Sequence, residues 1–299
     1  MRWLLALLAL HAASAFALAS RTYVSGVGDD ANPCTFAQPC RTFARAITAT
    51  ASGGTVSAID DASYGVVTIA KPVTIDGGGH AAAVLVASGS GILVDTTVVD
   101  DLVVLRSLSI DGLGTASAGI RALAVGKLIV EHCTIQNVAG HGIDFESASN
   151  PSYLLVSDST VAGNLDPSGV SSGVYHAAPF GNVVLERVRV ADNNIGVQLR
   201  TATMSIRDSI ISDNVQSNVK LVAANMGRID IDNSLIAGSL GGTGIYSQGL
   251  VASVYLSNST VTGNNQGLVT VLGAIDSFGN NRIFGNTTDG AVTTTLPQK

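Results

Sequence analysis

The sequence predicts an all-β protein in which short parallel strands wind into one solenoid of about 25 residues per coil. Three observations support this prediction. The chain repeats itself, each repeat alternates apolar and polar residues with a period of two, and Gly, Asn and Asp interrupt the strands at similar places. Such a unit cannot bury its apolar side alone, whereas stacked copies form a continuous core. We therefore expect each coil to climb by about 4.8 Å.

The repeat is visible when every unit is aligned on one anchor position. The anchors are Leu108, Cys133, Ser159, Val188, Ser209, Ser234, Ser259 and Asn281. Three residues before them stand the apolar residues Leu105, Val130, Val156, Leu185, Ile206, Ile231, Leu256 and Phe278, which we expect to point inward. The anchor serines have no repeating general base beside them, so they are interpreted as an internal ladder rather than as nucleophiles.

A second column of polar residues follows the second strand of most units. It consists of Asn164, Asn193, Asn214, Asn264 and Asn286. Short amide side chains at such positions can bond to the backbone and to each other from coil to coil. We expect a second ladder there.

The first residues, MRWLLALLALHAASAFALAS, have the layout of a secretory signal peptide. We assign it to residues 1–20, with cleavage near Ala19–Arg21, and expect a secreted or periplasmic protein. The apolar run is too short to cross a bilayer, and no later segment is long enough. Residues 21–55 are predicted to form an N-terminal strand, a disulfide loop and a capping helix. Residues 56–299 are predicted to form the solenoid with a C-terminal cap.

The N-terminal region contains the predicted disulfide and helix. Cys34 and Cys40 bracket a short loop, which in an exported protein suggests that they are bonded. In TFARAITAT, Phe43 and Ile47 share one helical face and Thr42 can cap the N-terminus, so this helix would cover the open end of the coil. Cys133 is an anchor and is expected to be a buried, unpaired thiol.

Composition excludes some classes of partner. The net charge is −6 and no Lys/Arg cluster is present, which argues against nucleic acid. No His/Cys/Asp/Glu set has metal-ligand spacing, and we predict no cofactor. The stretch GDDANP could bind Ca²⁺ loosely, but an Asp/Asn turn is the preferred interpretation. We expect a monomer.

The repeat and the opening TYVSGVGDDANPCTFAQPCRTFARAI together resemble right-handed parallel β-helix proteins of the pectate lyase/polygalacturonase superfamily, which share the pectin lyase fold. The resemblance covers roughly residues 21–299. It implies a single-stranded right-handed parallel β-helix with a short N-terminal capping helix. It also implies that such a chain can act on, or bind, a polysaccharide.

The stretch AGHGIDFE, residues 139–146, resembles the Gly-His-Gly of polygalacturonase-like enzymes, which would give His141 a catalytic role. Those enzymes also need aspartates in preceding coils. Here these positions read SGSGI, ending at Ile92, and ASAGI, ending at Ile120. The Arg-x-Lys that follows in such enzymes is also unmatched in this chain. Only Arg200 could supply that cation, and it comes one coil too late. The hydrolase machinery is therefore not carried over, and His141 is interpreted as a turn residue in solvent.

The same strands predict a polar face. If the aliphatic residue after each strand-starting Gly points inward, the next residue and the one two later point outward. The candidate binding residues on this face are Arg121, Asp144, Tyr175, Gln198, Lys220, Tyr246 and Gln248, with Glu146 and Arg200 in the second column. Aromatic, amide and charged groups suit a polyhydroxylated chain, and the insertion NLDPSGVSS could wall a groove. The alternative is a solvated face on which Arg121 and Asp144 merely pair.

Three functions remain open. The favoured one is an exported β-helix repeat protein without catalytic machinery, which binds a polysaccharide or a cell-surface glycan or is structural. The second is a polysaccharide lyase, glycoside hydrolase or epimerase acting on an acidic glycan, with Asp144, Glu146, His141 and Arg200 as candidate catalytic residues. The third is an adhesin-like surface module.

Overall fold

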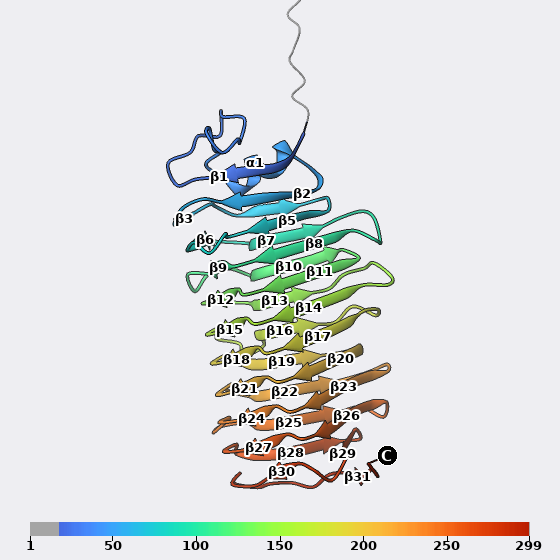
Figure 1. The fold of residues 1–299 in the computed structure, drawn as a ribbon. Coiled ribbons are helices and arrows are strands. Elements are labelled where there is room, and N and C mark those ends of the chain that lie inside the picture. Colours follow the sequence, from blue (N-terminus) through green and yellow to red (C-terminus); the bar gives the residue numbers. More distant parts are fainter. Residues whose placement is uncertain (1–17, 299) are drawn as a thin grey trace, which may run out of the picture.

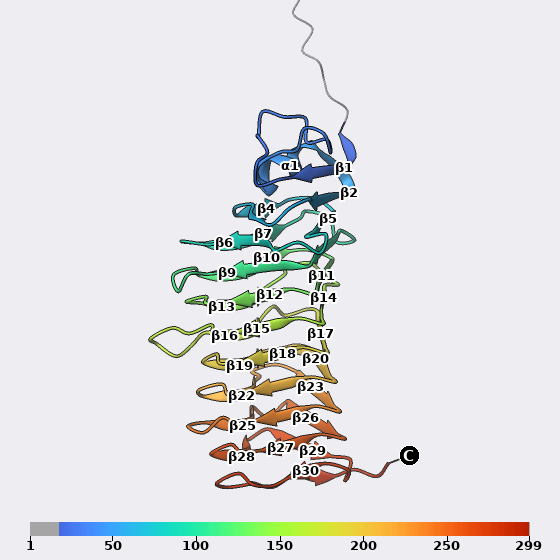
Figure 2. The same ribbon diagram turned by 60° about the vertical axis from the view of Figure 1, so that its left-hand side comes forward.

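The computed structural model describes residues 18–298, so residues 1–17 of the predicted signal peptide lie outside it. The described chain forms one elongated stack of coils, with its single helix at the N-terminal end (Figure 1). Figure 2 shows the same stack turned by 60°. Across residues 18–298, the search for a helix both long and apolar enough to span a bilayer found none.

Each coil contributes a strand to each of three parallel sheets. The twelve-stranded sheet contains β1 (Ala19–Val24), β2 (Thr50–Ala58), β5 (Val73–Asp76), β8 (Leu102–Arg106), β11 (Lys127–Glu131), β14 (Tyr153–Ser157), β17 (Asn182–Glu186), β20 (Ala202–Arg207), β23 (Gly227–Asp232), β26 (Ala252–Ser257), β29 (Ala274–Ser277) and β31 (Thr294–Thr295). The ten-stranded sheet contains β3 (Ala62–Ser63), β6 (Ala82–Leu85), β9 (Leu108–Asp111), β12 (Thr134–Gln136), β15 (Thr160–Ala162), β18 (Arg189–Ala191), β21 (Ile210–Ser212), β24 (Leu235–Ala237), β27 (Thr260–Thr262) and β30 (Arg282–Ile283). The nine-stranded sheet contains β4 (Val67–Ile69), β7 (Ser90–Asp95), β10 (Ala118–Ala124), β13 (His141–Phe145), β16 (Ser172–His176), β19 (Ile195–Leu199), β22 (Ser217–Val222), β25 (Thr243–Gln248) and β28 (Gln266–Val271).

A residue in the left-handed region makes the turn from the twelve-stranded to the ten-stranded sheet. Its φ lies between 46° and 55° in seven coils, at Ser107, His132, Asp158, Arg187, Asp208, Asn233 and Asn258. Asn, Asp and His tolerate this conformation better than most residues do, which explains why short polar residues recur just before the anchor.

The predicted inward column is confirmed for all units but the last. Leu105, Val130, Val156, Leu185, Ile206, Ile231 and Leu256 are at most 1% exposed. In the last coil, Leu256 aligns with Ser277, so the position assigned to Phe278 is wrong by one residue. The turn to Asn281 is longer there, and Phe278 is half-buried.

The predicted serine ladder is present inside the turn. The Oγ of Ser209 accepts from the Val188 N–H at 3.2 Å and donates to the Arg207 carbonyl at 2.6 Å, and Ser234 and Ser259 repeat this arrangement. Cys133 takes the same place. Its thiol is 3.3 Å from the Glu131 carbonyl, which gives a free, buried cysteine as predicted.

The asparagine ladder is also present, with one member that the sequence analysis missed. Asn164 and Asn193 donate their Nδ2 groups to the Oδ1 atoms of Asn193 and Asn214 at 2.8 and 2.9 Å. Ser239 occupies the next ladder position and is too short to continue it. Asn218, at the start of β22, fills the gap by accepting from Asn214 at 2.8 Å and donating to Asn264 at 2.9 Å.

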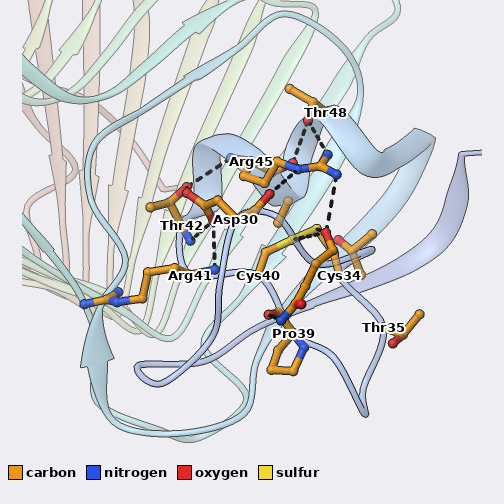
Figure 3. Close-up of a disulfide and its surroundings, with 12 residues drawn as sticks. Asp30, Cys34, Thr35, Pro39, Cys40, Arg41, Thr42, Arg45 and Thr48 are labelled. Carbon is orange, nitrogen blue, oxygen red and sulfur yellow. Dashed lines mark hydrogen bonds between the residues drawn. A yellow bond between two sulfur atoms is a disulfide. The ribbon is translucent and has the colours of Figure 1, made fainter.

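The N-terminal cap contains the predicted disulfide and helix. Cys34 and Cys40 are bonded, and α1 (Phe43–Ala49) buries Phe43 and Ile47 with Thr42 as N-cap (Figure 3). The Asp30 carboxylate accepts hydrogen bonds from Thr42 and from the backbone of residue 41, which ties the loop of Figure 3 to the helix start.

Candidate functional site

The outer face of the nine-stranded sheet carries the predicted polar column. Arg121, Asp144, Tyr175, Gln198, Lys220 and Tyr246 are consecutive partners in register, one per coil. The residues before them in the chain are aliphatic and buried, which turns these side chains outward. Glu146 and Arg200 follow strands β13 and β19 in the adjacent column. Sequence periodicity therefore locates this face.

A hollow of about 480 Å³ lies on this face. It is lined by His141, Ser168, Gly169, Val170, Tyr175, Ile195, Gln198, Arg200, Gln216 and Lys220. Of the predicted face residues, Arg121, Asp144 and Glu146 lie toward the N-terminal coils and do not line it. Tyr246 and Gln248 lie beyond its other side, where the Tyr246 hydroxyl and Gln248 Oε1 are 2.9 Å apart.

The insertion before β16 forms one wall of the hollow, as predicted. It projects beyond the neighbouring connections and is the yellow-green loop at the left of Figure 2. Asp166 Oδ1 accepts from the Val170 N–H and from Asn194 Nδ2 of the next coil. Gln216 Nε2, two coils on, donates to the Gly169 carbonyl at 2.7 Å. The loop is thus attached at its base and near its tip.

His141 is not a turn residue in solvent, and that prediction is wrong. It is the first residue of β13, aligned with Ala118 of β10. Its ring lies parallel to that of Tyr175, with centroids 4.2 Å apart, and its Nδ1 accepts a 3.0 Å hydrogen bond from the Ser172 N–H. Burial lowers the pKa of His141, opposed by the nearby charges of Glu146 and Asp166. The ring is therefore neutral at pH 7, with its proton on Nε2.

An acidic group lies on the N-terminal side of the hollow. Arg121 Nη2 is 3.0 Å from Glu146 Oε2, and Arg121 Nε is 3.2 Å from Asp144 Oδ2, although that contact is not aligned as a hydrogen bond. Burial and, to a smaller extent, the charge of Glu146 together raise the pKa of Asp144 to about 6, against the opposing charge of Arg121. Asp144 Oδ1 is buried without a hydrogen-bond partner. This carboxyl group therefore titrates near neutral pH.

A cationic group lies inside the hollow. Arg200 and Lys220 come from successive coils, and within residues 18–298 neither has a carboxylate at salt-bridge distance. Burial lowers the pKa of Lys220, and the positive charge of Arg200 lowers it further. Burial also raises the pKa of Tyr175, while Arg200 opposes that change. The two cations thus share a space without an anion from the described chain.

The described residues contain no group of three or more His, Cys, Asp and Glu side chains that could hold a metal ion. The polar groups on this face are two cations without a carboxylate partner among the described residues, an aromatic pair, amides and a separate carboxylate pair. Such a set can bind a charged, hydroxylated ligand along the coils.

The fold and this face define a parallel β-solenoid with a polar groove along one sheet. A family model described as a right-handed β-helix region matches residues 59–225, and the chain belongs to that family. The predicted right-handed parallel β-helix is thereby confirmed. A search of curated proteins found no match.

Solved structures show the same fold. The pectate lyase Pel9A is similar with a TM-score of 0.61 at 15% identity, over 92% of this chain and 79% of that chain. The A-module of the Azotobacter vinelandii mannuronan C-5 epimerase AlgE4 has a TM-score of 0.50 at 14% identity, over 83% of this chain and 91% of that chain. A rhamnogalacturonan lyase has a TM-score of 0.47 at 12% identity, over 82% of this chain and 75% of that chain. At these identities the likeness to the first two structures concerns the fold alone.

Proposed function

We propose that this protein is an exported β-helix protein that binds an acidic polysaccharide along the outer face of its nine-stranded sheet. The observation that carries this proposal is the pair Arg200 and Lys220, which meet in the hollow without a carboxylate partner from residues 18–298. Lys220 is half-buried and Arg200 is exposed. Cations without counter-charges can gain from an anionic ligand, because charge-assisted hydrogen bonds are stronger than neutral ones. A uronate carboxylate or a sulfate group would accept from both.

The neighbouring side chains fit the rest of a glycan. The stacked rings of His141 and Tyr175 offer apolar surface with polar edges, while Gln198 and Gln216 supply amide groups. The names pectate lyase and mannuronan epimerase associate this fold with acidic polysaccharides, which is an analogy at the level of fold. The Cys34–Cys40 bond supports an oxidising compartment and hence export.

The test is calorimetric titration of the mature chain with acidic oligosaccharides. Replacing Arg200 and Lys220 together by Gln should weaken binding about a hundredfold or more, since two charged hydrogen bonds are lost and each contributes about 1.5–3 kcal/mol. The matched control replaces Lys127 and Arg228, on the twelve-stranded sheet, by Gln and removes the same net charge. The control should bind like the wild type. Equal losses in both variants, or no binding by the wild type, would refute the proposal.

A lyase or epimerase acting on the same glycan is the second candidate. It is favoured by Lys220, whose lowered pKa increases the fraction of neutral amine available to remove a proton. Tyr175 and the neutral His141 lie in the same hollow as further proton-transfer groups. Incubation with polyuronates, followed by ultraviolet absorbance for unsaturated ends and NMR for epimerised sugars, tests this. Turnover that Lys220→Gln abolishes would support it; binding without any product would leave only the binding function.

A hydrolase is less well supported by the geometry. Asp144 and Glu146 both contact the one guanidinium of Arg121, from the same side. Paired catalytic carboxyls must instead flank the bond that is cleaved.

A further inference from the structure

The order of charges along the face bears on which acidic glycan can bind. Asp144, Tyr175, Gln198 and Lys220 are consecutive partners in register, so Asp144 and Lys220 are three coils apart, roughly 14 Å at about 4.8 Å per coil. Glu146 and Arg200 follow strand residues that are two coils apart, which is roughly 10 Å. A glycan lying along the coils would pass both groups.

The acidic end carries a net negative charge. Two carboxylates, Asp144 and Glu146, share the single guanidinium of Arg121, and no other cation among the described residues lies at salt-bridge distance from either carboxylate. Asp144 is 7% exposed, and its Oδ1 has no hydrogen-bond partner. Glu146 is half-exposed beside it. Glu146 can therefore accept a hydrogen bond from a ligand, whereas the net negative charge of this end repels an anion.

The cationic end has the opposite preference. Arg200 and Lys220 face the hollow, and Tyr175 lies between the two ends, within range of the charges of Asp144, Glu146 and Arg200. No described residue in the hollow is a carboxylate. The face thus changes from negative to positive within about two coils.

We propose that the ligand is a glycan of mixed acidic and neutral or amino sugars, in which an acidic sugar occupies Arg200 and Lys220 and a neutral or amino sugar donates to Glu146. A homopolymer of acidic sugars is disfavoured, because a chain that fills the hollow would also bring a carboxylate to Glu146. Like charges placed opposite each other are a common means of rejecting a wrong partner. This inference rests on the proposed binding function.

The test compares oligosaccharides of equal length in two groups. One group alternates a uronate with an N-acetylated amino sugar (hyaluronan, chondroitin and heparosan); the other contains only uronates (polygalacturonate and polymannuronate). For the wild type, the tightest alternating ligand should bind about tenfold or more tighter than either homopolymer. If a homopolymer bound most tightly of the five, the inference would be overturned, while the proposed function would remain intact. No binding by any of the five would overturn both.

The variant Glu146→Gln tests whether the negative charge of Glu146 is what weakens the binding of acidic homopolymers. It keeps the shape of a half-exposed side chain and should tighten homopolymer binding severalfold, while it weakens the alternating ligands modestly, because an amide oxygen still accepts a hydrogen bond but without charge. The control, Glu131→Gln, removes a carboxylate on the twelve-stranded sheet and should change neither group. An unchanged ratio between the groups in Glu146→Gln would refute the proposed role of the acidic end.

Discussion

The ring of His141 lies flat on the ring of Tyr175 of the following coil, with the two planes 3° apart. Residues of the two coils meet again where the Ser172 N–H donates to His141 Nδ1. His141 therefore connects β13 to the first residue of β16, directly after the loop that walls the hollow. Its contacts make it a structural element of the site rather than an isolated turn residue.

Replacing His141 by Ala should accordingly destabilise the protein by about 1–3 kcal/mol, through loss of an aromatic pair and of a hydrogen-bond acceptor. His141→Phe should lose less, because it keeps the ring and gives up only the acceptor. Urea unfolding followed by circular dichroism measures both. His80→Ala, which alters an exposed imidazole near Asp61, is the control and should change stability by less than about 0.5 kcal/mol. Equal small effects at both histidines would contradict the assigned contacts.

The contrast between His141 and the turn residues shows which features a repeat can predict. The left-handed turns, the serine column and the inward aliphatics depend on neighbours at fixed positions within each unit, so period and residue type suffice. The His141–Tyr175 stack depends on the insertion at residues 164–172, which sets where Ser172 lies. An irregular loop has no counterpart elsewhere in the chain from which its path could be inferred.

Asn218 belongs to the repeat, but its role in the asparagine ladder could not be predicted from the repeat alone. The sequence shows Asn where other strands of this sheet begin with Gly, and it shows Ser239 where the amide column expects Asn. Either departure alone looks like tolerated variation. Only the packing of adjacent coils shows that one side chain replaces the other. The contacts of Arg121 with Asp144 and Glu146 likewise could not be predicted from the sequence, because they depend on the register and the side-chain rotamers of neighbouring strands.

The substitution Asn218→Gly should destabilise the protein by about 1–3 kcal/mol, because it leaves buried amide groups of the ladder without partners. Ser239→Asn alone should also be destabilising, by about 1–3 kcal/mol, since Asn218 already fills the space. The double variant should recover most of both losses, because Asn at 239 can resume the regular ladder. A double-mutant cycle of unfolding free energies measures this coupling. Simple additivity of the two losses would show that the two positions do not exchange roles.

The inward column gives a sharper stability test. Ile231 is 1% exposed, so Ile231→Ala should cost about 2–5 kcal/mol and Ile231→Asp should prevent folding. Ser253→Asp on β26 is the tolerated counterpart, since Ser253 faces outward and aligns with Arg228 of β23. Ser257 also lies on the outer side, but its hydroxyl donates to Asp232, so a carboxylate there would add repulsion. Similar urea midpoints for Ile231→Asp and Ser253→Asp would invalidate the assignment of faces.

The three cysteines should react differently. Burial raises the pKa of the Cys133 thiol to about 12, which keeps it protonated and unreactive in the folded state. Alkylation without reductant should modify no cysteine in the native protein and only Cys133 after denaturation. Mass spectrometry measures the number of modified residues. Modification of Cys34 or Cys40 in the oxidised protein would contradict their bond.

The last prediction concerns Asp144, whose folded-state pKa is raised from 3.8 to about 6, chiefly by burial. A raised carboxyl pKa means that the folded state binds this proton more tightly than the unfolded state. The resulting stabilisation is complete below about pH 4 and is lost as the pH rises through about 6. Asp144→Asn removes this dependence, so the unfolding free energy of the variant relative to the wild type should increase by up to about 3 kcal/mol from acid to neutral pH. Urea unfolding of both proteins across this range measures the difference and cancels the contributions of the other carboxylates. A flat difference for Asp144→Asn would mean that this carboxyl group is solvated, and the acidic end of the face would then lose its buried member.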